Sequence, residues 1–149
     1  MLEFIATLVI TASSGLLFCY WFRYTCVLIL KAKTTRDFAG EVAAANQLSF
    51  LAVQSELQAG ATDLNPLHDS LNRDYALLTY LVSHAAGHRG DVSLEDRMLQ
   101  FNYRLMGAWY RVSRPISATV ARKALEEMSL VVEHFANAMG ERAMAGSAA

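Results

Sequence analysis

The stretch from Phe4 to Phe22 constrains this chain most, because its nineteen residues, FIATLVITASSGLLFCYWF, include no charged side chain. As an α-helix rising about 1.5 Å per residue it is roughly 28 Å long, close to the roughly 30 Å hydrocarbon core of a bilayer. Glu3 precedes the stretch and Arg23 follows it. The sequence therefore predicts one membrane-spanning helix. The alternative, a buried core helix of a soluble domain, is disfavoured by this length.

A cleaved signal peptide is a second alternative for the same stretch. Such peptides begin with a positively charged region, whereas the residues before this stretch are Met1, Leu2 and Glu3. The apolar run is also longer than a signal-peptide core, and no small-residue cleavage site closes it. We therefore expect the helix to remain as an anchor.

The positions of the basic residues predict the orientation of this anchor. Four of them follow it closely, whereas Glu3 is the charged side chain on its N-terminal side; the four are Arg23, Lys31, Lys33 and Arg36. Lys and Arg concentrate on the cytoplasmic side of membrane helices. We expect an inner or plasma membrane protein with its N-terminus outside and residues from about 31 onward in the cytoplasm.

The charge of the remaining chain limits its partners. The 149-residue chain has a net charge of −1, but residues 1–36 carry +3 and residues 37–149 carry −4. A mildly acidic domain lacks the basic patch that nucleic-acid binding requires. The expected partners are the membrane together with another membrane protein or a second copy of the chain, and no nucleic acid.

Small side chains recur every four residues within the anchor, at Thr7, Thr11, Gly15 and Cys19. Such a stripe lets another membrane helix approach closely, and threonine hydroxyls can bond across the contact. The alternative is that a membrane helix merely tolerates these small residues. We predict that the stripe is a helix-packing surface.

Beyond the anchor the apolar residues follow helical spacing, and no segment alternates with the period of a strand. We predict four helices. The first runs from Thr35 to a stop at Gly60, and the second begins at Asn65-Pro66 and ends near Gly87. The third is capped by Ser93 and stopped by Pro115, and the fourth ends at Gly140.

The predicted fold class is therefore all-α, with one N-terminal transmembrane helix followed by an antiparallel bundle of about four helices. Residues 1–33 form the anchor and juxtamembrane segment, and residues 34–140 form a cytoplasmic bundle. Residues 141–149 are rich in small side chains and are expected to be a flexible tail.

The third helix carries two apolar stripes and therefore a wide apolar face. The first stripe comprises Leu94, Met98, Phe101, Leu105, Trp109 and Val112, and the second comprises Leu99, Tyr103, Met106 and Tyr110. We expect Phe101 and Trp109 in the core. Tyr and Arg are enriched at interfaces, so Tyr103, Tyr110, Arg104 and Arg111 form a candidate partner surface. Core packing nevertheless remains the favoured role for most of these aromatic residues.

The search for chemistry yields no catalytic or cofactor motif. His84 and His88 are four residues apart, but a metal site needs a third and fourth ligand, which His134 would supply only if the fold brought it close. No Glu-x-x-His pair, nucleophile elbow or phosphate-binding loop occurs. We expect no enzyme activity, no metal and no cofactor.

These observations favour a non-catalytic, membrane-anchored interaction protein or an accessory subunit of a membrane complex. The alternative is a membrane-tethered sensor bundle that binds a ligand or a metal between its helices.

Overall fold

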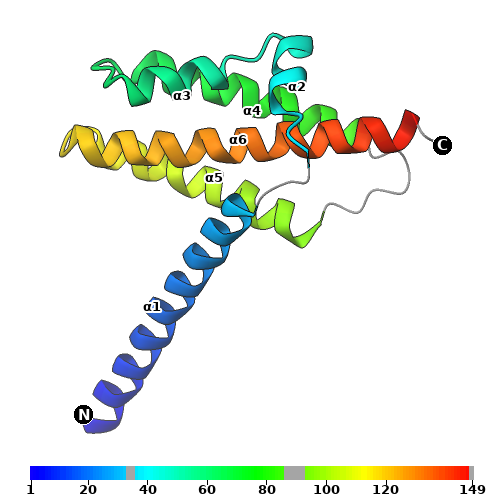
Figure 1. Cartoon of the computed structure of the whole chain (residues 1–149). Helices are drawn as coiled ribbons and strands as arrows, with labels where there is room; N and C mark the ends of the chain where they lie inside the picture. Colours follow the sequence, from blue (N-terminus) through cyan, green and yellow to red (C-terminus); the bar gives the residue numbers. More distant parts are fainter. Residues whose placement is uncertain (33–35, 86–92, 148–149) are drawn as a thin grey trace. The chain divides into compact units, whose positions relative to one another are not determined.

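The computed structural model describes residues 1–32, 36–85 and 93–147, and all regular structure in these ranges is helical (Figure 1). This confirms the all-α prediction. The chain divides into two compact units, Met1–Ala32 and Lys33–Ala149. The described helices are α1 (Leu2–Lys31), α2 (Ala39–Asn46), α3 (Phe50–Gln58), α4 (Asn65–Ala85), α5 (Leu94–Ser113) and α6 (Ala118–Ser147).

The first unit is the single helix α1, which is long and apolar enough to cross a membrane. No other helix in the described part of the chain meets that condition. The hydroxyls of Thr7 and Thr11 each donate to the carbonyl oxygen four residues earlier, both at 2.8 Å. Both hydroxyls therefore have hydrogen-bond partners within the helix itself.

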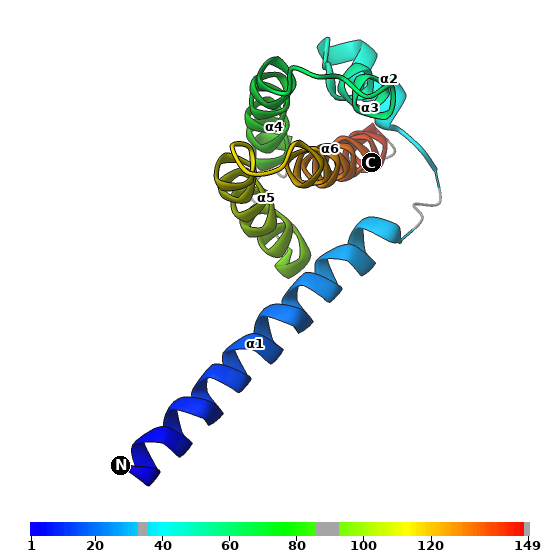
Figure 2. The same ribbon diagram turned by 90° about the vertical axis from the view of Figure 1, so that its left-hand side faces the viewer.

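The second unit is a bundle built around α6. This helix contacts α2, α3, α4 and α5, and Figure 2 shows α3, α4 and α5 arranged around it. Consecutive helices from α3 to α6 alternate in direction (Figure 1). The side chains that α6 buries completely are Ala121, Leu125, Met128, Val131, Val132, Phe135 and Ala136. The second unit is therefore an antiparallel bundle in which α6 is the central helix.

The segment predicted as one helix from Thr35 to Gly60 is two helices, so that prediction is wrong. Gln47 adopts a left-handed conformation, φ 53° and ψ 42°, which ends α2. The amide of Ser49 then donates to the Oδ2 atom of the buried Asp74 at 2.6 Å, at the start of α3. A carboxylate from α4 thus satisfies a free donor at a helix N-terminus, which local sequence does not reveal.

The predicted boundaries of α5 agree with the structure. The Ser93 hydroxyl accepts a hydrogen bond from the Asp96 amide at 3.0 Å, which confirms the N-cap of α5. Helix α5 ends at Ser113, just before Pro115, as predicted. Helix α4 begins at Asn65, but the side chain of Asn65 accepts a hydrogen bond from Tyr110 instead of capping the helix.

Helix α6 does not stop at Gly140, so the prediction that residues 141–149 form a flexible tail is wrong as far as Ser147. Gly140 lies against Phe38, and a Cβ atom at position 140 would overlap the Phe38 side chain. The Phe38 amide donates to Asn137 Oδ1 at 2.8 Å. Gly140 is therefore a packing residue within the helix. Two residues after Gly140, Arg142 donates to Asp96 Oδ2 at 3.0 Å and ties this region to α5.

Candidate interaction surface

Helix α5 has an inner face that belongs to the core. Leu99, Tyr103, Met106 and Tyr110 are all buried there. The phenol of Tyr103 donates to Asn72 Oδ1 at 3.0 Å, and the phenol of Tyr110 donates to Asn65 Oδ1 at 3.1 Å. Two asparagines on α4 therefore satisfy two buried hydroxyls, as buried polar groups require.

This burial overturns the expectation that Tyr103 and Tyr110 belong to a partner surface. Tyr103 also stacks on Tyr75 with ring centroids 3.8 Å apart, and Tyr110 stacks on His68 at 4.7 Å. The sequence stripe is correct, but its assignment is wrong, because the asparagines that make burial of these phenols favourable lie about 30 to 45 residues away on another helix.

The outer face of α5 is apolar and exposed, which overturns the expected burial of Phe101 and Trp109. The exposed fractions on this face are 75% for Leu94, 59% for Phe101, 39% for Leu105, 51% for Trp109 and 58% for Val112. Soluble domains expose single apolar residues routinely, but a contiguous row of large ones usually marks an interaction site. We define these five residues as the outer stripe.

A row of arginines runs along one flank of the outer stripe. Arg97, Arg104 and Arg111 are spaced seven residues apart on α5, and all three are exposed. None of the ion pairs among the described residues involves them. Sequence analysis selected Arg104 and Arg111 but missed Arg97, although the seven-residue repeat is visible in the sequence. We call these three residues the arginine row.

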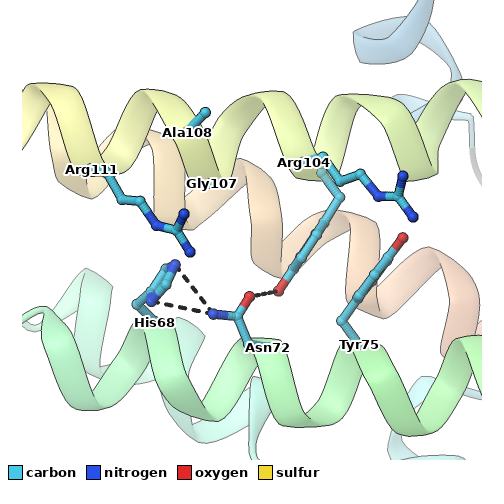
Figure 3. A pocket seen from close by; sticks show the side chains of 8 residues that line it. His68, Asn72, Tyr75, Arg104, Gly107, Ala108 and Arg111 are labelled. Carbon is cyan, nitrogen blue, oxygen red and sulfur yellow. Dashed lines mark hydrogen bonds between the residues drawn. The ribbon is translucent and has the colours of Figure 1, made fainter.

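Arg104 and Arg111 also line a groove of about 300 Å³ between α4 and α5 (Figure 3). In this view Arg111 extends toward His68, and the guanidinium of Arg104 lies beside the hydroxyl of Tyr75. Gly107 and Ala108, which have little or no side chain, line the same groove. His68, Asn72 and Tyr75 come from α4 and were missed, because nothing in their own stretch marks them as neighbours of α5.

The electrostatics of the groove follow from partial burial beside cations. Burial raises the pKa of Tyr75, while the positive charge of Arg104 opposes this rise. Burial also raises the pKa of Tyr103, and the neighbouring Tyr75 and Asp74 raise it further. Both tyrosines are therefore neutral at physiological pH. The groove consequently offers cationic guanidinium groups beside hydroxyl, amide and imidazole groups.

The predicted helix-packing residues lie on the exposed surface of α1. Thr7 and Thr11 line a shallow hollow of about 390 Å³ together with Phe4, Leu8 and Ala12. No heavy atom would contact a Cβ at Gly15 within 4 Å. Since the two threonine hydroxyls already donate within α1, they can take part in hydrogen bonds across a contact at the stripe of Thr7, Thr11, Gly15 and Cys19 only as acceptors.

The histidines considered as metal ligands have other neighbours. His84 Nδ1 lies 2.8 Å from the Tyr80 carbonyl oxygen, whereas His134 Nε2 lies 4.0 Å from Asp96 on α5. Burial lowers the pKa of His134, and the charge of Asp96 opposes this change. His88 lies outside the described residues. Within the described ranges, no three His, Cys, Asp or Glu side chains are grouped so that they could hold a metal ion.

Comparison with known proteins identifies no relative: no family model matches the chain, and neither a curated protein nor a solved structure matches it.

Proposed function

We propose that this chain is a single-pass, membrane-anchored interaction protein, an accessory subunit that joins a membrane complex and performs no catalysis itself. In the proposed topology α1 spans the membrane with its N-terminus outside. The bundle then lies in the cytoplasm, because the basic residues follow the anchor. Another membrane protein is the proposed partner.

The observation that carries this proposal is the outer stripe of α5. The bundle buries the opposite face of the same helix, so its core does not need Leu105, Trp109 or Val112. Large apolar side chains in water are unfavourable by about 25 cal/mol per Å² of apolar surface relative to burial. Trp is also among the residues that dominate the free energy of binding at interfaces. The outer stripe is therefore best explained as a surface that a partner covers.

Site-specific photo-crosslinking in native membranes tests this proposal. A photoreactive phenylalanine analogue replaces Trp109 in one variant and Tyr80 in a matched control, since Tyr80 is also large, aromatic and exposed but lies on α4. We expect a discrete protein adduct from position 109 and none from position 80. Equal adducts from both positions, or lipid adducts alone at 109, would contradict the proposal.

The groove between α4 and α5 supports a second candidate, a membrane-tethered bundle that binds a small anionic ligand. Arg104 and Arg111 can bind a carboxylate or phosphate in bidentate fashion, and the volume of about 300 Å³ is at the lower limit of known ligand sites. Native mass spectrometry of the purified full chain separates the candidates. A bound small molecule that is lost in an Arg104→Ala variant would favour the second candidate over the first.

A further inference from the structure

The residues on the outer side of α5 follow a heptad pattern. Leu94, Met98, Phe101, Leu105, Ala108 and Val112 alternate spacings of four and three residues. This is the pattern of a helix that packs lengthwise against another helix, with one seam about 30 Å long over twenty residues. The seam lies on the side of α5 opposite to Leu99 and Tyr103, and its residues Leu94, Leu105 and Val112 are exposed.

The arginine row runs parallel to this seam. In packed helix pairs, the positions that flank the seam carry charges that select the partner and its orientation. Here Arg97, Arg104 and Arg111 occupy one flanking position in three successive heptads, and no ion pair among the described residues engages them. A helix that covers the seam therefore meets three positive charges along one edge.

We infer that the outer stripe of α5 binds an amphipathic helix of a partner protein, whose apolar seam is flanked by Asp or Glu at heptad spacing. This inference rests on the proposed function and names the chemistry of the partner in it. The partner helix covers the outer stripe, and its carboxylates pair with the arginine row. Charge complementarity of this kind chooses the partner more than it increases affinity.

A second copy of the chain is a poorer occupant of this surface. Helix α5 has two acidic residues, Glu95 and Asp96, and Asp96 is buried and already paired with Arg142 at 3.0 Å. An antiparallel pair of α5 helices would bring the two arginine rows together. A parallel pair would place each row opposite Glu95, Asn102 and Trp109, of which only the first is acidic. Like charges that flank a helix pair are destabilising.

An anionic lipid surface is also a poorer occupant. Helices that lie on membranes carry a strongly basic polar face and bury a broad apolar face. In α5 the arginines line one flank, and the opposite face is the core of the bundle. Residues 37–149 carry a net charge of −4, which an anionic leaflet repels.

The test uses the full chain in nanodiscs of zwitterionic lipid and two designed peptides of about three heptads. Both peptides carry leucine at the seam; one has glutamate at the flanking positions and the other has lysine. We expect the glutamate peptide to bind at least about tenfold more tightly, as measured by fluorescence anisotropy. In an Arg104→Glu, Arg111→Glu variant we expect this preference to reverse.

The matched control is Arg114→Glu, Lys123→Glu, which changes the net charge equally at exposed positions outside the arginine row. We expect the control to keep the preference for the glutamate peptide. Circular dichroism and the Tm of both variants establish that the bundle remains folded. Equal affinity for the two peptides, no binding of either, or reversal in the control as well would each overturn the inference.

A lipid occupant is tested in the same system with brominated anionic lipids and a Trp21→Phe background, in which Trp109 is the remaining tryptophan. Quenching of Trp109 would overturn the inference in favour of the membrane.

The inference can fail separately from the proposed function. A protein crosslink at position 109 without charge selectivity keeps the function and rejects the acidic helix. Charge selectivity without a crosslink rejects the function and keeps the chemistry of the surface.

Discussion

This protein has two exposed apolar surfaces, one on α1 and the other the outer stripe of α5. They differ in how their apolar side chains are distributed around the helix. Around α1 the apolar side chains face all directions, and no charge interrupts Phe4 to Phe22. On α5 they form one narrow row, with Arg97, Arg104 and Arg111 beside it. Lipid covers a helix on every side, whereas a partner helix covers one seam. Under the proposed function, this distribution of apolar residues is what separates the anchor from the docking surface.

The largest test of this difference places a charge in each surface. Leu16→Arg in α1 should reduce stable membrane insertion at least about tenfold, because Arg near the centre of a membrane helix costs roughly 2.5 to 3.5 kcal/mol. Leu105→Arg on α5 should leave insertion unchanged. Carbonate extraction of membranes followed by quantitative blotting measures both variants. Comparable losses for Leu105→Arg would mean that α5 also depends on lipid.

The next test compares the two faces of α5 within the bundle. Leu99 is completely buried, so Leu99→Ala should lower the free energy of unfolding by about 3 kcal/mol through lost burial and a cavity. Leu105 is partly exposed, and Leu105→Ala should cost less than about 1 kcal/mol. Denaturant unfolding of the full chain in nanodiscs, followed by circular dichroism, measures both values. A larger loss for Leu105→Ala would place the outer stripe in the core.

A smaller effect concerns the hydrogen bond that the phenol of Tyr103 donates to Asn72. Tyr103→Phe should cost about 1 kcal/mol at neutral pH, because it removes one hydrogen bond and leaves Asn72 Oδ1 without that donor. The pKa of Tyr103 is raised in the folded state, so its contribution is present below about pH 10 and is lost as the pH rises further.

The same variant should therefore lose less stability than the wild type between neutral and strongly alkaline pH. Tyr80→Phe, at an exposed position on α4, is the control and should follow the wild type. Urea unfolding at a series of alkaline pH values measures the difference. Parallel curves for wild type and Tyr103→Phe would show that ionisation of this phenol does not limit stability.

The smallest expected effect concerns the small-residue stripe of α1. A Cβ at Gly15 would contact nothing within the chain, so Gly15→Leu should act only through a second helix. If the stripe packs against a partner, this change should weaken association about threefold, or roughly 0.6 kcal/mol. Leu16→Ala should change little. A transmembrane-association reporter with residues 1–36 measures both, and equal signals for wild type and both variants would leave the stripe facing lipid.

Prediction from sequence succeeded where the determinants of structure are local. An uncharged stretch of sufficient length defines α1, and Ser93 and Pro115 define the ends of α5 through contacts within a few residues. The break between α2 and α3 was missed because the carboxylate that accepts from the Ser49 amide at the start of α3, that of Asp74, lies on another helix. The continuation of α6 past Gly140 was missed because glycine commonly ends helices. Here the missing side chain of Gly140 instead makes room for Phe38.

The site itself shows the same limit more sharply. Both stripes of α5 are apolar at helical spacing, so periodicity alone does not decide which one is buried. That decision depends on Asn65 and Asn72, which provide acceptors for the phenols of Tyr110 and Tyr103. The sequence therefore predicted both apolar stripes of α5, but not that Phe101 and Trp109 would be exposed while Tyr103 and Tyr110 are buried.

The contact between Phe38 and Asn137 has a consequence for the order of events during synthesis. These residues are 99 positions apart, and Asn137 lies on the helix against which α2, α3, α4 and α5 all pack. Of the helices described here, α6 leaves the ribosome after the other five. The earlier helices of the bundle must therefore wait with their apolar faces uncovered, a state in which chains are prone to aggregate. Truncation shortly before residue 137 would leave the nascent domain in this state permanently.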